Sequence, residues 1–198
     1  MLNVNAPIST AASVEQRAQA VEAVLHAHGM EPAAYIDQAH HLYEETWLPH
    51  NGARVVAKAW TDAAFKQRLL ANGKSAVAEL GLDMPRHHRH LVVLPNTASV
   101  HNVICCTLCS CTAFTIIGLP PDWYKDLEYR ARAVRESRTV LSQMGLDLPP
   151  DMEIRVWDTT ADTRYMVLPL QPAHTLGWAQ DKLAALVTQD AMIGVARL

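Results

Sequence analysis

The stretch ICCTLCSC, residues 104–111, contains every cysteine of this 198-residue chain. The four are Cys105, Cys106, Cys109 and Cys111. Because no cysteine lies elsewhere, a disulfide to a distant part of the chain is excluded. Branched residues precede the cluster (SVHNVICC, 99–106) and a Gly-Pro turn follows it (GLPP, 118–121), which predicts a loop between a strand and a helix. Loops in such positions carry function more often than they serve core packing.

Three common roles of clustered cysteines fit this stretch poorly. Buried free thiols pack as small apolar residues, but chance rarely gathers all four in one place. A redox Cys-x-x-Cys pair would use Cys106 and Cys109 and would leave the other two without a role. Structural zinc takes a tetrahedron of ligands, and its second pair here would have to be histidines. The nearby histidines are His87, His88, His90 and His101, and their spacing matches no common zinc finger.

A fourth role, a compact metal chelate, uses the backbone as well as the sulfurs. The thiolates of Cys109 and Cys111 are separated by two peptide nitrogens, those of Ser110 and Cys111. A trivalent strong-field metal can deprotonate these amides, so that two sulfurs and two nitrogens fill a plane. Cys106 would then supply an axial sulfur and leave the sixth position open for catalysis. Soft sulfur ligands indicate cobalt or iron rather than magnesium or calcium.

The composition is that of an ordinary globular protein. Hydrophobic residues make up 49% and charged residues 19%, and the net charge is −3. This charge argues against nucleic acid or an anionic membrane as the main partner. The stretch 1–16 lacks the basic and apolar parts of a signal peptide, and no apolar run approaches the ~18 residues of a membrane span. We therefore expect a cytoplasmic protein with reduced thiols.

The secondary-structure signals change in character along the chain. Ser13 with Gln16 forms a capping-box pattern, and Asp62 suits a later helix cap. The expected strands are 90–96, 99–106, 153–158 and 164–170, and the expected later helices run from about Asp122 to Gly145 and over 179–195. The sequence thus predicts an α+β protein, with a helical N-terminal arm over 1–84 and a metal-binding catalytic domain over 85–198.

The stretch CTLCSC, residues 106–111, resembles the metal-binding claw of the α subunit of nitrile hydratases. Other stretches resemble that subunit in the same order: NGARVVAKAWTD (51–62), NTASVHNVI (96–104), GLPPDWY (118–124), YRARAVRE (129–136), EIRVWDTTADTRYMVLP (153–169), GW (177–178) and LVTQDAMIGV (186–195). The resemblance covers nearly the whole chain and is weakest over 1–40 and 83–95. It implies a layered α-β-β-α arrangement for the metal-binding domain.

The resemblance also implies the ligands of the metal. They would be the sulfurs of Cys106, Cys109 and Cys111 and the backbone nitrogens of Ser110 and Cys111. Cys109 would be oxidised to a sulfinic acid and Cys111 to a sulfenic acid, of which only the sulfenic acid is readily reversible. Thr107 matches the cobalt-type claw. We therefore expect one low-spin Co(III) ion per chain, with Fe(III) as the alternative.

The implied reaction is the hydration of a nitrile to the corresponding amide, with the metal as a Lewis acid. The nucleophile would be either the sulfenate oxygen of Cys111 or an activated water. Phe114, which stands where most members carry Trp, and Thr107 would line the substrate pocket. A β subunit of one or two chains would supply arginines to the oxidised sulfurs.

Two other functions stay open at this point. The γ subunit of thiocyanate hydrolase resembles this chain and has the same claw, and a non-catalytic metal-binding or carrier protein needs only the sulfurs. Cys105 is expected to be a buried strand residue and not a ligand. The stretch PRHHRH, residues 85–90, departs from the family and suggests no function.

Overall fold

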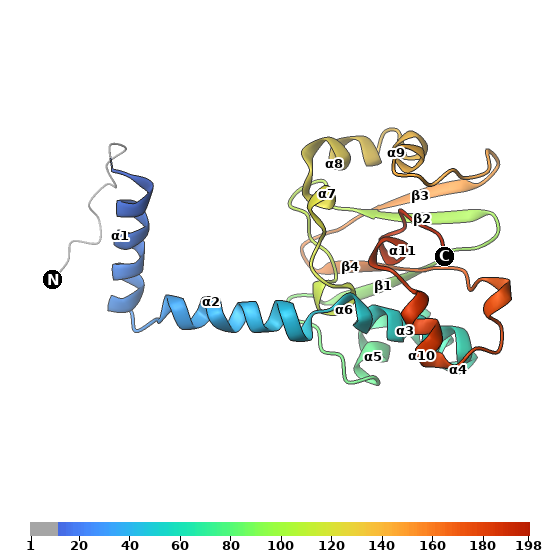
Figure 1. Ribbon diagram of the computed structural model, residues 1–198, viewed down its shortest axis with the longest axis horizontal. Helices are drawn as coiled ribbons and strands as arrows, with labels where there is room; N and C mark the ends of the chain where they lie inside the picture. Colours follow the sequence, from blue (N-terminus) through green and yellow to red (C-terminus); the bar gives the residue numbers. More distant parts are fainter. Residues whose placement is uncertain (1–11) are drawn as a thin grey trace. The chain divides into compact units, whose positions relative to one another are not determined.

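The computed structural model describes residues 12–198 (Figure 1). The stretch 1–16, which is not expected to be a signal peptide, therefore lies largely outside the described residues. The chain forms two compact units, one ending at Glu44 and one spanning Glu45–Leu198. Within the described part, every helix is too short or too polar to cross a lipid bilayer.

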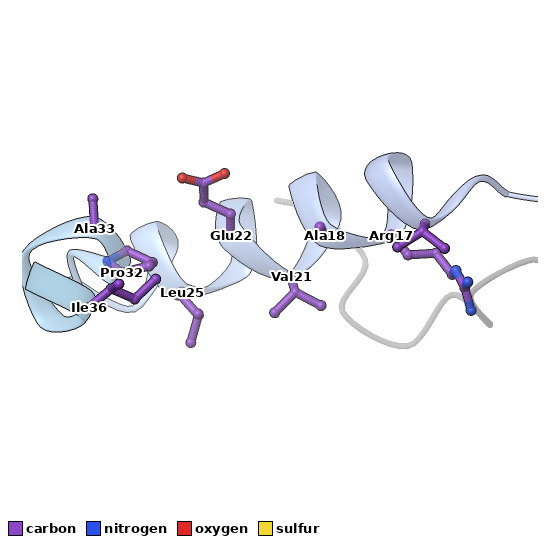
Figure 2. Close-up of a pocket in the computed structure, with 9 residues that line it drawn as sticks. Arg17, Ala18, Val21, Glu22, Leu25, Pro32, Ala33 and Ile36 are labelled. Carbon is purple, nitrogen blue, oxygen red and sulfur yellow. The ribbon is translucent and has the colours of Figure 1, made fainter. Parts of the chain in front are cut away.

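The described part of the first unit consists of two helices without a buried side chain. α1 (Val14–Ala27) begins at the predicted capping box, in which the Ser13 hydroxyl accepts from the Gln16 N–H and the Gln16 side chain accepts from the Ser13 N–H. α2 (Pro32–His41) has proline in its first turn, where no backbone N–H is needed. Apolar side chains line a groove along the two helices (Figure 2), among them Val21, Leu25 and Ile36.

Four strands of the second unit form two parallel two-stranded sheets. β1 (His90–Pro95) pairs with β4 (Thr163–Leu168), and β2 (Val100–Cys105) pairs with β3 (Glu153–Asp158). These strands confirm the four predicted ones, with small shifts at their ends. Because β2 and β4 also contact each other, the two sheets form the inner layers of the unit (Figure 1).

Helices cover both outer sides of these sheets. The helices near β1 and β4 are α3 (Pro49–Thr61), α4 (Ala63–Ala71), α5 (Gly73–Ala78) and α10 (Gln180–Leu186). Those near β2 and β3 are α7 (Asp122–Lys125), α8 (Leu127–Ala133) and α9 (Ser137–Gln143). The shorter remaining elements are α6 (Phe114–Ile117), α11 (Gln189–Ile193), the π-helical turn η1 (Leu42–Thr46) and the 3-10 turn η2 (Ala173–Thr175). The layers follow the order α-β-β-α, which confirms the expected α+β class.

Helices α3, α4 and α5 belong to the body rather than to an arm. Val56 of α3 and Phe65 of α4 are fully buried in the same hydrophobic cluster as Ile104 of β2. The structure therefore does not divide at the expected 84/85 boundary, since its compact units separate between residues 44 and 45. A helical pattern that continues to residue 84 does not reveal which of its helices bury an apolar face against the sheets.

Capping residues divide two of the expected helices. The helix expected from Asp122 to Gly145 is three short helices. Asp126 separates α7 from α8 because it accepts hydrogen bonds from the first N–H groups of α8, whereas α9 begins without a side-chain cap. The segment 179–195 forms α10 and α11, because the Thr188 hydroxyl accepts from an N–H of α11. Side chains of this kind compete with helix continuation and favour helix starts.

The end of α11 is held closely against β2. Gly194 has a φ of 96°, and a Cβ at this position would fall on the carbonyl oxygen of Asn102. His101 Nε2 lies 2.7 Å from the carbonyl oxygen of Gly194, and its Nδ1 lies 3.3 Å from Asn96 Nδ2. Burial lowers the pKa of His101. The neutral ring therefore donates from Nε2 and accepts at Nδ1, which ties the C-terminal segment to β2.

Gly194→Ala is expected to destabilise the fold by roughly 2–5 kcal/mol, because left-handed alanine costs ~1–2 kcal/mol and overpacking adds ~1–3 kcal/mol. Urea-induced unfolding measures this loss. Gly145→Ala is the matched control, since Gly145 also has a positive φ but an added Cβ meets no atom within 4 Å. The control should lose only about 1 kcal/mol. Equal losses in the two variants would contradict the close packing of Gly194 on β2.

Candidate metal centre

The cysteine stretch lies where β2 leaves the sheet and before α6 begins. Cys105 is the last residue of β2 and is fully buried, whereas Cys106 opens the loop that leads to Phe114. Burial, together with the charges of Asp158 and Cys106, raises the pKa of Cys105 to about 12. Cys105 is thus a packed strand residue, as the sequence predicted. The loop occupies the carboxyl end of parallel strands, where ligand sites of α/β proteins commonly lie.

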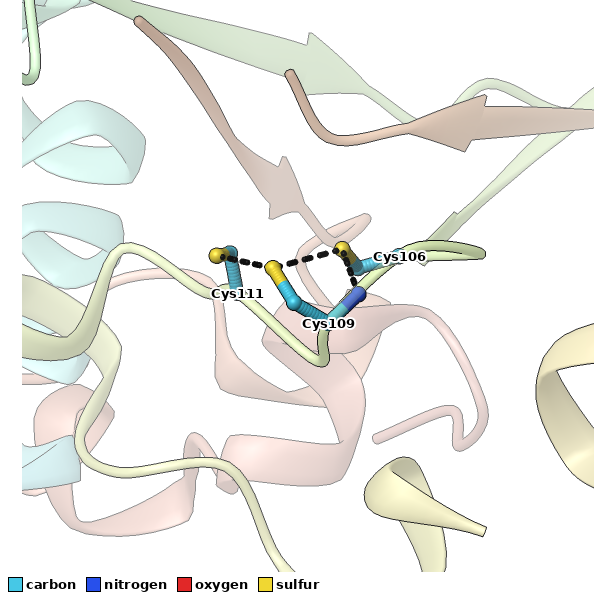
Figure 3. A group of neighbouring side chains, drawn as sticks. All are labelled: Cys106, Cys109 and Cys111. Carbon is cyan, nitrogen blue, oxygen red and sulfur yellow. Dashed lines mark hydrogen bonds between the residues drawn. The ribbon is translucent and has the colours of Figure 1, made fainter. Parts of the chain in front are cut away.

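The other three cysteines bring their sulfurs together within the claw, residues 106–111 (Figure 3). Cys109 Sγ lies 2.7 Å from Cys111 Sγ and 3.6 Å from Cys106 Sγ. Cys106 is buried, Cys111 is half-buried and Cys109 is exposed. Among residues 12–198, this is the only group of three or more His, Cys, Asp or Glu side chains close enough to share an ion.

The spacing of the sulfurs matches tetrahedral zinc only in part. With Zn–S bonds of ~2.3 Å, a tetrahedron has sulfur–sulfur edges of about 3.8 Å. The Cys106–Cys109 edge of 3.6 Å is close to this length, and the Cys109–Cys111 edge of 2.7 Å is shorter. The histidines considered as a second zinc pair are also outside the sulfur cluster. His101, for example, lies near the start of β2, and its ring is hydrogen-bonded to the carbonyl oxygen of Gly194.

A left-handed turn at Ser110 creates the short sulfur–sulfur edge. Side chains two residues apart in an extended strand point the same way but lie about 7 Å apart. Ser110 has a φ of 75°, the only positive φ outside glycine in the described residues, and this turn brings its two neighbouring cysteines together. Such a conformation costs ~1–2 kcal/mol, and non-glycine residues that keep it cluster at functional sites.

The N–H groups of the claw favour the thiolate form of one of its cysteines, Cys106. Burial alone would raise the pKa of Cys106, but N–H groups of Cys109, Cys111 and Leu108 that face its sulfur outweigh burial and lower that pKa. The Cys109 N–H lies 3.3 Å from the Cys106 sulfur. Burial and the hydrogen bond with Cys109 raise the pKa of Cys111 to about 12. A metal that binds here must therefore displace the Cys111 proton, since thiolates are the ligands.

Thr107 anchors the start of the claw to the end of β3. Its backbone N–H donates to Asp158 Oδ1 over 2.9 Å, and its hydroxyl donates to Asp158 Oδ2 over 2.5 Å. The parallel register places Asp158 beside Cys105, and the Asp158 carboxylate therefore reaches Thr107, two residues further along the chain. The Thr107 hydroxyl is thus hydrogen-bonded to Asp158, a residue that the sequence analysis did not single out. An acidic residue at the end of the predicted strand 153–158 was the available signal.

Arg164 is a second residue that sequence reasoning did not single out. It is 4% exposed, its Nη1 donates to the carbonyl oxygens of Thr160 and Thr163, and its charge lowers the pKa of Cys111. Its Nε has no hydrogen-bond partner, and it forms no ion pair with a carboxylate among residues 12–198. A buried cation needs an anionic neighbour, and the claw sulfurs can provide one. The sequence signal was a charged residue on the strand face that also carries Met166 and Leu168.

Phe114 is the centre of an aromatic group next to the claw. Its ring lies 4.8 Å from the ring of Trp47 and 5.2 Å from that of His88. His88 is buried, its Nδ1 has no hydrogen-bond partner among the described residues, and its ring contacts His87 at 4.4 Å. His88, which belongs to the stretch PRHHRH (85–90), is therefore buried against Phe114.

The fold carries a cluster of three cysteine sulfurs that fits a metal site, and comparison with known proteins gives the family of the chain. The profile described as "Nitrile hydratase, alpha chain" matches residues 12–196, and the chain belongs to this family.

Four relatives illustrate the match. The nitrile hydratase subunit alpha of Rhodococcus sp is 47% identical over 193 residues, covering 97% of this chain and 96% of its own. The cobalt-containing nitrile hydratase subunit alpha of Pseudonocardia thermophila is 45% identical, covering 92% and 89%. The thiocyanate hydrolase subunit gamma of Thiobacillus thioparus is 40% identical, covering 78% and 68%. A structure of the Fe-type nitrile hydratase from Comamonas testosteroni Ni1, with a pair of histidines replaced, is 56% identical, with a TM-score of 0.88, covering 93% and 89%.

We expect His88 to make the folding stability depend on pH. Burial, followed by the charges of Arg164, His87 and Lys74, lowers its pKa from 6.5 to about 4. Between these values the unfolded chain binds a proton that the folded chain does not. Stability is therefore full above pH ~6.5 and falls as the pH decreases towards about 4.

His88→Leu tests this expectation. Urea unfolding at pH 7 and pH 5 should show that the variant loses less stability on acidification than the wild type, by roughly 1–2 kcal/mol. His101, whose pKa is also lowered by burial, leaves a residual pH dependence in the variant. An unchanged difference between the two pH values would show that His88 takes up its proton in the folded chain.

Proposed function

We propose that this chain is the α subunit of an enzyme that hydrates nitriles to amides at a low-spin trivalent cobalt or iron ion. The observation that carries the proposal is the sulfur cluster of the claw, closed by the left-handed Ser110 within a family of nitrile hydratase α chains. We also propose a cytoplasmic location, where thiols stay reduced until a metal binds.

The donor atoms of the claw fit such an ion. Its ligands would be the sulfurs of Cys106, Cys109 and Cys111 and the backbone nitrogens of Ser110 and Cys111, with one ion per chain. Soft sulfur donors favour cobalt or iron over magnesium or calcium. When bound, the ion would act as a Lewis acid towards the nitrile nitrogen.

The remaining chemistry belongs to the side chains. An external oxidant, dioxygen or a peroxide, would oxidise the exposed Cys109 to a sulfinic acid and Cys111 to a sulfenic acid. The nucleophile towards the nitrile carbon is either the sulfenate oxygen of Cys111 or a water near it. Arg164 places a buried positive charge beside these anions, and Asp158 holds Thr107 and with it the start of the claw.

A partner would complete the site from the solvent side. Leu108, at the tip of the claw, is 86% exposed, and the neighbouring Cys109 is exposed as well. Two oxidised anionic sulfurs at an open surface favour cationic donors from another chain. We therefore propose a β subunit, of one or two chains, that covers the claw and contributes arginines.

The substrate is proposed to be an organic nitrile rather than thiocyanate. Phe114 packs between Trp47 and His88, whose ring is neutral near pH 7 because its pKa is lowered to about 4. Phe114 and Thr107 would then border the substrate, and the aromatic wall offers apolar contact rather than a cation for an anionic substrate. This arrangement favours nitrile hydration over the thiocyanate chemistry of the γ-subunit relatives.

Two observations bear on the metal and point in different directions. Thr107 matches the cobalt-type claw, and the relative from Pseudonocardia thermophila is cobalt-containing. The Fe-type structure from Comamonas testosteroni is more similar in sequence, at 56% identity against 45%. Co(III) is our first expectation, and Fe(III) is the alternative that metal analysis decides.

The proposal predicts the composition and activity of the chain co-expressed with a β subunit in medium that supplies both metals. Elemental analysis should give one cobalt or iron ion per α chain. The mass of the peptide with Cys109 and Cys111 should increase by about three oxygen atoms. The complex should convert a simple nitrile to its amide. Zinc with unmodified thiols would instead indicate a structural or carrier protein, and carbonyl sulfide from thiocyanate would indicate the hydrolase.

Adjacent cysteines provide matched variants for the same measurements. Cys106→Val removes a proposed ligand, so metal content and activity should fall to background. Cys105→Val replaces a buried strand residue outside the sulfur cluster and should leave both near the wild-type level. Equal loss in the two variants would contradict the assignment of the ligands.

A further inference from the structure

The downstream end of the claw is held by a buried phenol. Tyr124, on α7, donates from its hydroxyl to the carbonyl oxygen of Cys111 over 3.2 Å. Since a carbonyl oxygen only accepts, the phenol must carry the proton. Tyr124 is fully buried, and burial raises its pKa, so it stays neutral. Cys111 is the residue that the proposed site uses twice, through its sulfur and through its backbone nitrogen.

The claw therefore has two external attachments, one at each end. Asp158 holds Thr107 at the start, and Tyr124 holds Cys111 at the end. Between them lies Ser110, whose left-handed conformation costs energy and relaxes if either end is free. The other hydrogen bonds of the claw within residues 12–198 join its cysteines to one another.

The phenol itself is held rigidly. The Tyr124 ring lies 5.8 Å from the ring of Trp123 and 5.9 Å from that of Tyr129. Asp126 caps α8 between the two tyrosines and so fixes the turn from α7 to α8. Tyr129 donates its hydroxyl to the carbonyl oxygen of Ile104, a residue of β2 outside the claw, over 3.2 Å. Each phenol thus donates to one carbonyl oxygen, and only Tyr124, whose hydroxyl also lies beside that of Thr159, holds the claw.

We infer that Tyr124 is a positioning residue for the metal site, which keeps the main chain of Cys111 in the conformation that brings its sulfur against that of Cys109. The inference rests on the proposed function, because it assigns the residue a part in that same metal site. Residues that orient metal ligands in this way commonly change metal affinity or activity by ~10–100-fold when they are replaced.

Tyr124→Phe and Tyr129→Phe, each co-expressed with the β subunit, form the matched test. Each removes one hydroxyl and leaves one buried carbonyl oxygen without its donor, so both should lower the melting temperature by similar amounts. Only Tyr124→Phe should shift the sulfur-to-metal charge-transfer absorption band and release metal to a chelator about 10-fold faster. Its kcat should fall about 10-fold while KM stays near the wild-type value.

Three results would overturn the inference. The first is that the Tyr124→Phe and Tyr129→Phe complexes have the same charge-transfer band, the same cysteine oxidation and the same rate of metal release. The second applies if Tyr124→Phe does not fold, in which case 3-fluorotyrosine is placed at position 124 instead. The fluorinated phenol is a stronger hydrogen-bond donor, so metal release should be slower than in the wild type. An unchanged rate of metal release would contradict the inference. The third is a wild-type complex without bound metal or added oxygen, which would overturn the proposed function as well.

Discussion

The parallel pairing of β2 with β3 is the constraint on which the site depends. It sets Cys105 and Asp158 side by side at the ends of their strands, so the carboxylate reaches Thr107 as soon as the chain leaves the sheet. Cys105 faces the core, and the next residue, Cys106, begins the claw. The end of the strand therefore separates Cys105, which is packed in β2, from Cys106, the first of the proposed ligands in the loop.

The electrostatics of the site follow from the same arrangement. Several cysteine sulfurs within a few ångström make a concentrated negative charge once they are deprotonated, and water cannot solvate the buried ones. Arg164 is buried in the neighbouring sheet without a carboxylate partner among the described residues, and it faces this charge. His88 is kept neutral by the same cation and by burial. The chain thus supplies a fixed positive charge of its own beside the claw.

Local patterns in the sequence identified much of the fold. The four strands, the Ser13 capping box and the Asp62 cap depend on near neighbours and were predicted from them. The domain boundary was not, because the burial of Phe65 beneath the sheet is a long-range contact. The claw was recognisable from its cysteine spacing. Asp158 and Arg164 were not recognised as part of the site, because only sheet pairing brings them to it.

Energetically, the claw is a strained segment in a rigid frame. The left-handed Ser110 is unfavourable alone and persists because Asp158 and Tyr124 hold the two ends of the loop. A frame of this kind organises ligands before metal arrives, which lowers the entropy cost of binding. The two attachments come from separate elements, β3 and α7.

X-ray absorption at the metal edge of the purified αβ complex tests the central claim most directly. The account predicts three sulfur and two nitrogen neighbours around a single cobalt or iron ion, the nitrogens being those of Ser110 and Cys111. A tetrahedral zinc spectrum, or a cobalt or iron ion with histidine in place of backbone nitrogen, would contradict it.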